Sequence, residues 1–188
     1  AEFIISELIQ LLNGYKGKQW EEMPRELTNL KIGIVGLGVT GQLLAECLKP
    51  FGAELHYFSR TRKPEWEKKG VDYLPLDDLL EQSEVISFHL PKNTQLISEE
   101  EFEKLGSGKI LINTSLGLPF EEKAFQKWIK NEDNFAIFDG DGKKELSSAS
   151  LAYDNVIALD TSAGWSSQTL RRLSDKVLHN INEYCEDS

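Results

Sequence analysis

The sequence predicts an α/β fold, a Rossmann-type doubly wound parallel sheet with helices on both faces. Three observations predict it. Short β-rich apolar runs alternate with helical stretches, which is the pattern of a parallel sheet covered by helices. A glycine-rich turn follows the first of these runs. The 188 residues, 40% hydrophobic and 28% charged, suffice for one substantial globular core. We therefore expect a single domain over 1–188, with its core at about 30–160.

The elements of this core follow in order along the chain. The predicted strands are 31–36, 53–58, 85–90, 109–114, 135–139 and 156–160. The helices predicted between them are 40–50, 76–82, 98–105 and 121–130. The third of these helices begins with Ser98-x-x-Glu101, a capping box in which each side chain bonds the main chain of the other residue.

Two further helices flank the core. The helix at 166–185 has ordinary amphipathic spacing with one apolar stripe. The helix at 2–13 is apolar over more than one stripe, so we expect it to pack on something besides its own sheet. The expected partner is a second copy of the chain, which would form a homodimer, or a domain missing from the chain.

Composition excludes several classes of function. A formal charge of −10 argues against nucleic acid as a partner, because such binding depends on Lys and Arg. No apolar run approaches a membrane span. Cys47 and Cys185 lie far apart without a CxxC motif, which indicates a reducing cytoplasm and neither a disulfide framework nor a metal site. The chain opens at Ala1 without an initiating Met or a signal-peptide pattern, which hints at processing or trimming.

A glycine turn joins the run at 31–36 to the helix at 40–50. Glycines spaced as in GxGxxG allow a tight turn, close approach of the backbone to a pyrophosphate, and close packing of helix on strand. The motif alone is weak evidence, and the alternative is an ordinary glycine turn. Its strand-turn-helix-strand context makes a dinucleotide site the favoured interpretation. The predicted contacts are Gly36, Gly38, Val39, Thr40 and Gly41.

The end of the second strand bears on which dinucleotide binds. An NAD site normally places Asp or Glu there for the ribose 2′-hydroxyl, whereas an NADP site removes the acid and supplies Arg. This chain reads Ser59-Arg60-Thr61-Arg62-Lys63. Ser59 does not repel a 2′-phosphate, and Arg60 with Arg62 would bind it through paired hydrogen bonds. We therefore predict NADP(H) in preference to NAD(H), with a solvated basic loop as the alternative.

Further motifs stand where the later strands end. They are His89-Leu90-Pro91, Asn113-Thr114-Ser115 and Phe138-Asp139, with Ala163-Gly164-Trp165 after the last run. Together with the glycine turn, their order and spacing resemble the cofactor-binding domain of the D-isomer-specific 2-hydroxyacid dehydrogenases. The resemblance covers nearly the whole chain and includes the helix that follows Ala1.

The resemblance implies roles for these residues. It places Leu90, Pro91 and Thr94 along the dinucleotide, Thr114 and Ser115 under the nicotinamide ribose, and Asp139 opposite the nicotinamide carboxamide, and it adds Gly164 to the cofactor-binding residues. It also implies hydride transfer to or from a small 2-oxo or 2-hydroxy acid. In this family the substrate domain lies largely upstream, and we expect it to be absent from this chain.

Two positions depart from the family pattern. Leu116 stands where the family has an Arg that holds the substrate carboxylate, and Thr161 stands where it has the catalytic His. Glu145 is a candidate for the supporting acid, at a spacing from Asp139 that departs from the family pattern. Loss of a general acid–base typically costs roughly 10²–10⁴ in rate, so we expect impaired or divergent turnover. His89 is the one remaining histidine at a strand end and hence a candidate catalyst, with a positional role as the alternative.

Three hypotheses follow. The chain belongs to an oxidoreductase that uses NADP(H), with altered catalysts or a changed substrate. Alternatively, it is a catalytically inactive dinucleotide-binding sensor or interaction module. The third hypothesis is a reductase of another NADP family, such as a β-hydroxyacid or imine reductase, and the motifs after the later strands count against it.

Overall fold

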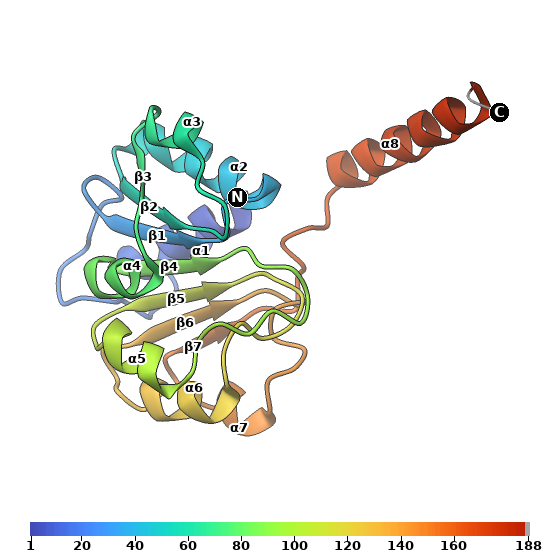
Figure 1. The fold of residues 1–188 in the computed structure, drawn as a ribbon. Helices are drawn as coiled ribbons and strands as arrows, with labels where there is room; N and C mark the ends of the chain where they lie inside the picture. Colours follow the sequence, from blue (N-terminus) through green and yellow to red (C-terminus); the bar gives the residue numbers. More distant parts are fainter. Residues whose placement is uncertain (187–188) are drawn as a thin grey trace.

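A seven-stranded parallel sheet forms the centre of the protein in a computed structural model that describes residues 1–186 (Figure 1). The strands lie in the order β3-β2-β1-β4-β5-β6-β7. Their bounds are β1 (Lys31–Val35), β2 (Glu54–Phe58), β3 (Val71–Tyr73), β4 (Val85–Phe88), β5 (Ile110–Asn113), β6 (Phe135–Phe138) and β7 (Val156–Ala158). The order reverses between β1 and β4, as in a doubly wound sheet, and the predicted fold class is confirmed.

Helices connect the strands and flank them at both ends of the described chain. They are α1 (Glu2–Leu12), α2 (Val39–Leu48) with the short 3₁₀ turn η1 (Lys49–Phe51), α3 (Pro64–Glu67), α4 (Leu76–Gln82), α5 (Glu99–Leu105), α6 (Glu122–Ile129), α7 (Ser148–Leu151) and α8 (Ser167–Glu186). All the strands and helices expected from the sequence are present, and β3, α3 and α7 are additional. The capping box of α5 is confirmed, because the Glu101 carboxylate accepts the Ser98 N–H at 2.7 Å.

Alternate residues of the central strands pack on opposite faces of the sheet. Ile110 and Ile112 of β5 belong to the cluster formed with α1 and α2, and Leu111 between them belongs to the cluster formed with α4, α5 and α6. All four residues of β5 are buried, as are those of β4 and β6. A strand covered on both faces has a continuous apolar sequence, which explains the short apolar runs at the predicted strands.

The carboxyl ends of six strands meet at one edge of the sheet. Through the parallel pairings, the row runs Phe58–Val35–Phe88–Asn113–Phe138–Ala158 across β2, β1, β4, β5, β6 and β7. Every loop that carries a predicted site residue begins just after this row. The sheet register therefore gathers segments that are far apart in the sequence.

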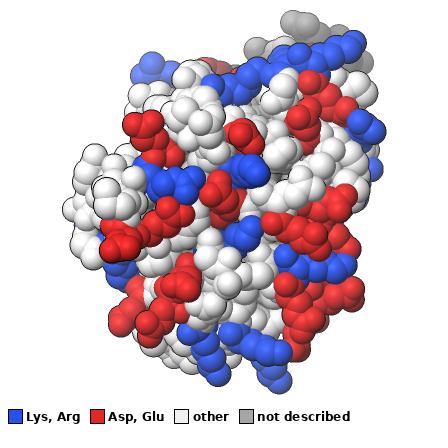
Figure 2. All heavy atoms as spheres, turned by 90° about the vertical axis from the view of Figure 1, so that its left-hand side faces the viewer, with Lys and Arg blue, Asp and Glu red and all other residues white. Residues whose placement is uncertain are grey.

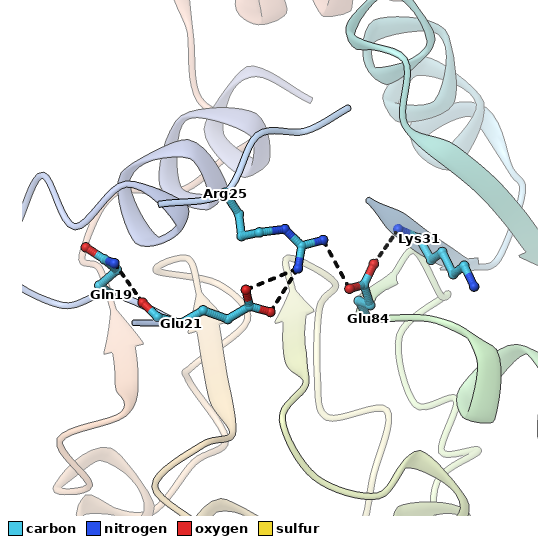
Figure 3. Close-up of polar contacts among 5 residues, drawn as sticks. All are labelled: Gln19, Glu21, Arg25, Lys31 and Glu84. Carbon is cyan, nitrogen blue, oxygen red and sulfur yellow. Dashed lines mark hydrogen bonds and ion pairs between the residues drawn. The ribbon is translucent and has the colours of Figure 1, made fainter. Parts of the chain in front are cut away.

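The segment between α1 and β1 is fixed to the opposite edge by a polar network (Figure 3). Arg25 donates to Glu21 at 2.9 Å and to Glu84, which precedes β4, at 3.2 Å. The other carboxylate oxygen of Glu84 accepts the N–H of Lys31 at 3.0 Å, and Gln19 donates to the carbonyl of Glu21 at 2.7 Å. Figure 2 shows this side of the molecule, where Lys and Arg residues lie among Asp and Glu residues.

The two flanking helices differ in their packing. In α1, Ile4, Leu8, Leu11 and Leu12 are buried, and the remaining apolar residues are partly buried against the same core. The core of its own sheet therefore covers more of α1 than the sequence suggested. Helix α8 forms where expected but extends away from the sheet (Figure 1), and its apolar stripe is exposed, Leu173 by 60%. No helix among residues 1–186 combines the length and apolar character that crossing a bilayer requires.

Candidate functional site

A cleft of about 880 Å³ opens at the carboxyl ends of the strands. Its floor is the point between β1 and β4 where the strand order reverses, which is where open α/β sheets bind ligands. The loops after β1, β2, β4 and β5 line it, and the segment after β7 adds to the rim. Of the residues predicted from the sequence, the lining includes Gly36, Gly38, Val39, Thr40, Ser59, Arg60, Thr61, His89, Leu90, Pro91, Thr94, Thr114, Ser115, Leu116 and Gly164.

The three glycines of the turn play three different parts. Gly36 has a φ of 99°, in the left-handed region, and a methyl group there would clash with the carbonyl of His89. Gly41 lies inside, where a methyl group would clash with the carbonyl of Gly36. A methyl group on Gly38 would meet nothing within 4 Å, so the backbone at Gly38 is open to the cleft. These are the turn, the helix packing and the open approach that a pyrophosphate cradle requires.

Helix α2 points its N-terminus into the cleft. Gly38 is its N-cap residue, and no side chain caps the first turn. The N–H groups of the first turn of a helix lack partners within the helix, and together with the helix dipole they stabilise an anion. Gly38, Val39 and Thr40 all line the cleft. The arrangement suits a phosphate group.

The loop after β2 separates the two arginines predicted to act together. Arg60 lines the cleft, as do Ser59, whose hydroxyl donates to the carbonyl of Thr61 at 2.6 Å, and Lys63. Arg62 does not line it, because its guanidinium binds the Glu67 carboxylate through two hydrogen bonds of 2.7 Å. In the structure the partner of Arg62 is therefore a carboxylate five residues away, and a contact between Arg62 and an anion stays a prediction.

Ser115 joins the loops after β4 and β5. Its hydroxyl donates to the carbonyl of Phe88 at 3.1 Å and accepts the N–H of Leu90 at 3.0 Å. The N–H of Ser115 donates in turn to Asn113 at 3.1 Å. Ser115 therefore holds Leu90 and Thr114 in place along the cleft wall, with its own hydroxyl already engaged.

Asp139 does not line the cleft, contrary to expectation. Its side chain is 1% exposed. One carboxylate oxygen accepts the N–H of Gly142 at 2.7 Å and the other accepts that of Ala163 at 2.7 Å. A carboxylate satisfied by two buried N–H groups remains inside, because turning outward would leave both donors unpaired. Asp139 thereby fixes the chain after β7, which brings Ala163 and Gly164 to the cleft.

The residues at the two divergent positions differ in their relation to the cleft. Leu116 is 54% exposed and lines the cleft. Thr161 is exposed and lies outside the lining, where its carbonyl accepts the N–H of Gly140 at 3.0 Å. Glu145 is also outside the lining, but a methyl group on Gly117 would lie 3.5 Å from both of its carboxylate oxygens. The structure therefore places Glu145 beside the loop that carries Leu116.

His89 lies against the glycine turn. Its Nε2 is 3.0 Å from the Ser87 hydroxyl and its Nδ1 is 3.3 Å from the Thr40 hydroxyl. Burial lowers the pKa of the imidazole from 6.5 to about 4, and the positive charge of the chain's amino terminus adds to this effect. His89 is therefore neutral at neutral pH. His56 and His179 lie elsewhere, on β2 and α8.

The cleft also includes residues that sequence reasoning missed. Ala1 and Ile4 of the first helical turn reach it, as do Leu37, Leu43, Phe58, Lys63, Leu96 and Ala163. Lys63 had a signal, because it follows the two arginines in the basic stretch. Ala1 and Ile4 had none, since only tertiary packing brings α1 beside the loop after β1. Within residues 1–186, no three His, Cys, Asp or Glu side chains are grouped as metal ligands.

Comparison with known proteins relates the chain to one family of dehydrogenases. A family model described as "D-isomer specific 2-hydroxyacid dehydrogenase, NAD binding domain" matches residues 4–159. The glyoxylate reductase of Korarchaeum cryptofilum is 31% identical over 159 residues, which are 80% of this chain and 47% of that protein. The glyoxylate reductase of Thermococcus litoralis is 42% identical over 103 residues, 53% of this chain and 31% of that protein. The chain thus spans about half or less of the length of these relatives.

Solved structures share the fold. The D-lactate dehydrogenase of Aquifex aeolicus, solved with NAD and lactic acid, matches with a TM-score of 0.80 and 21% identity, over 99% of this chain and 66% of that one. The apo D-lactate dehydrogenase of Escherichia coli matches with a TM-score of 0.78 and 23% identity, over 100% of this chain and 64% of that one. At these identities the likeness supports the fold alone.

Proposed function

The chain belongs to the D-isomer-specific 2-hydroxyacid dehydrogenase family as its NAD-binding domain, and from this premise we propose that it binds NADP(H) in an oxidoreductase of divergent activity. The reaction class would be hydride transfer to or from a small 2-oxo or 2-hydroxy acid. The observation that carries the proposal is the composition of the cleft. Its lining combines a glycine turn, an open helix N-terminus, Arg60 and Lys63, and among the described residues it contains no Asp or Glu.

The preference for NADP(H) is supported by the end of β2. An acid at this point would bind the ribose 2′-hydroxyl of NAD, whereas the chain places Ser59 and Arg60 there, both in the cleft. A guanidinium binds a phosphate with paired, charge-assisted hydrogen bonds, and Lys63 adds a second positive charge. The solved Aquifex aeolicus relative contains NAD, so the proposal is that this chain differs from that relative in its choice of dinucleotide.

Each part of the cleft has a distinct task in this proposal. The first turn of α2 holds the pyrophosphate, Arg60 holds the 2′-phosphate, and Thr114 with Leu90 and Pro91 lies along the remainder of the dinucleotide. When bound, the dinucleotide supplies or accepts a hydride at its nicotinamide. Leu116 presents an apolar surface where the family pattern has a cation, so it cannot hold a substrate carboxylate by charge. The Thr161 hydroxyl does not titrate near neutrality, so it cannot exchange a proton as an imidazole does.

Leu116 and Thr161, which replace the family's Arg and His, also support the alternative, a dinucleotide-binding sensor or interaction module without turnover. Leu116 and Trp165 are 54% and 72% exposed. The same exposure suits a substrate domain that closes over the cleft, and we propose that the 188 residues form one cofactor-binding domain that such a second domain completes. A homodimer formed through α1 and a cytoplasmic location are further parts of the proposal, the latter because Cys47 and Cys185 are free thiols.

A direct titration of NADPH and of NADH tests the choice of dinucleotide. We expect NADPH to bind with a Kd in the micromolar range or lower, and NADH to bind more weakly. Arg60→Asp should weaken NADPH selectively. Lys68→Asp is the matched control, because it makes the same charge change at an exposed residue of the same basic stretch outside the cleft. Equal or tighter binding of NADH by the unmodified chain would refute the NADP(H) preference.

A turnover assay distinguishes the enzyme from the sensor. We expect negligible oxidation of NADPH by this chain with glyoxylate or with other small 2-oxo acids. Steady-state oxidation of NADPH with a kcat of about 1 per second or more would show that Leu116 and Thr161 do not impair the reaction. Binding of NADPH without turnover by a longer form that contains the second domain would favour the sensor.

A further inference from the structure

We propose that His89 is a positioning residue that turns the hydroxyl of Thr40 toward a phosphate of the bound dinucleotide. The inference rests on the function proposed above, because it concerns the same cleft. It replaces an acid–base role for His89 with a role in binding.

The ring of His89 bridges the central strand and the phosphate-binding turn. His89 follows β4 directly, and its N–H donates to the carbonyl of Val35 at 2.8 Å. One ring nitrogen meets Ser87 of β4 at 3.0 Å, and the other meets Thr40, the second residue of α2, at 3.3 Å. The carbonyl of His89 lies against Gly36, where it leaves no space for a methyl group. The main-chain carbonyl and the ring of His89 thus both contact the glycine turn.

The direction of these hydrogen bonds is restricted because a neutral imidazole carries one N–H. In one arrangement, Ser87 donates to Nε2, and Nδ1–H donates to the oxygen of Thr40. In the other, Nε2–H donates to the Ser87 hydroxyl, and the Thr40 hydroxyl donates its own hydrogen to Nδ1. Ser87 is fully buried and can act as donor or acceptor, so it permits both.

A phosphate in the cleft selects the first arrangement. Thr40 is exposed and lines the cleft at the helix N-terminus, where an anion is favoured. When Nδ1–H donates to the Thr40 oxygen, the Thr40 hydrogen is free to donate to a phosphate oxygen. The chain Ser87, His89, Thr40, phosphate then runs in one direction, and each bond polarises the next. In the second arrangement the hydroxyl presents only lone pairs, which repel the anion.

The same contacts disfavour a catalytic role. Both ring nitrogens are engaged by protein hydroxyl groups, Nε2 by that of Ser87 on β4 and Nδ1 by that of Thr40. A general base needs a nitrogen within hydrogen-bond reach of the substrate. The pKa of about 4, lowered chiefly by burial, also places the imidazole far from the working range of a proton shuttle at neutral pH.

A double-mutant cycle on NADPH binding tests the proposal. Thr40→Val should weaken NADPH about tenfold, as expected for loss of a hydrogen bond to an anion. His89→Leu should weaken it by a similar factor, and the double variant should be no weaker than the weaker single variant within about twofold. Adenosine 2′-monophosphate is the control ligand, because it lacks the pyrophosphate, and its affinity should not change in these variants. His89→Asn keeps a donor toward Thr40 and should restore most of the affinity.

A second measurement needs no variant. Nitrogen-15 NMR of the imidazole in the unmodified chain reports which ring nitrogen carries the hydrogen, and we expect Nδ1–H when NADPH is bound. The Nε2–H tautomer in the complex, additive effects in the cycle, or equal weakening of adenosine 2′-monophosphate would each overturn the proposal. If the unmodified chain binds NADPH in these cases, the proposed function stands; if it binds neither NADPH nor NADH, both proposals fail.

Discussion

The guanidinium of Arg62 is held by the carboxylate of Glu67 through two hydrogen bonds of 2.7 Å. The pair raises the pKa of Arg62 and lowers that of Glu67, chiefly through these bonds. The guanidinium also lies 5.2 Å from the ring centre of Tyr73. Helix α3, which carries Glu67, thus holds Arg62 outside the cleft, whereas Arg60, two residues earlier, lines it.

This relationship predicts that Arg62→Ala leaves the affinity for NADPH within about twofold, whereas an arginine that contacts the phosphate would cost tenfold or more. The Arg62 side chain is exposed, so loss of the pair should leave the free energy of unfolding nearly unchanged. Titration of NADPH against the variant is the measurement. A tenfold loss of affinity would show that Arg62 leaves Glu67 when the cofactor binds.

The glycine turn predicts opposite outcomes for two similar substitutions. Gly38→Ala should fold normally, because a methyl group there meets nothing within 4 Å and the φ of −80° suits any residue. It should weaken dinucleotide binding, because the methyl group projects where the pyrophosphate would approach. Gly41→Ala should instead lower the free energy of unfolding by about 1–3 kcal/mol, because its methyl group meets the carbonyl of Gly36.

Urea unfolding and a binding titration of both variants separate these effects. Normal NADPH affinity in Gly38→Ala would contradict a pyrophosphate at that point. Unchanged stability in Gly41→Ala would show that helix α2 can shift away from β1 at no cost.

The buried carboxylate of Asp139 predicts a stability defect. Asp139→Asn replaces one acceptor oxygen with an NH₂ group that faces a backbone N–H, either that of Gly142 or that of Ala163. We expect the free energy of unfolding to fall by about 1.5–3 kcal/mol, the usual cost of losing a buried charge-assisted hydrogen bond. Asp160→Asn is the control, because Asp160 is exposed and pairs only with Lys143 at the surface. Equal effects of the two substitutions in urea unfolding would contradict this account.

The lowered pKa of His89 predicts a pH-dependent stability. In the unfolded chain the imidazole has its ordinary pKa of 6.5, and in the folded chain its pKa is about 4. Between these values the unfolded chain binds a proton that the folded chain does not, so the free energy of unfolding falls as the pH is lowered. From pH 7.5 to 5.0 the unmodified chain should lose about 1–2 kcal/mol more than His89→Gln, allowing for solvent screening of a half-buried group.

Urea unfolding of both proteins at the two pH values is the measurement. The comparison with His89→Gln removes the contribution of the carboxylates, which titrate in both proteins. Equal losses in the two proteins would show that the imidazole is more solvated than its burial indicates.

The elements missed from the sequence share a physical cause. Strand β3 has three residues, and α3 and α7 have four each, so none repeats an apolar period long enough to recognise. Helix α8 was recognised by its period, but a period shows only that a helix has an apolar face. It does not show what covers that face, and in the structure the face is exposed.

The sequence by itself determined the features that depend on neighbouring residues. The strands, the longer helices, the capping box and the glycine turn follow from local spacing, because backbone geometry and side-chain periodicity act within a few residues. The positions at the carboxyl ends of the strands followed too, since parallel pairing brings all such ends to one edge.

Only the tertiary structure decided which partner each polar side chain takes. Arg62 and Asp139 stand at positions that suggested cofactor contacts, and both are held by the protein instead, by Glu67 and by two backbone N–H groups. His89 stands at a position that suggested catalysis, and its ring spans Ser87 and Thr40. Such choices depend on competition among groups that meet only after folding, in an interior where an unpaired polar atom is costly.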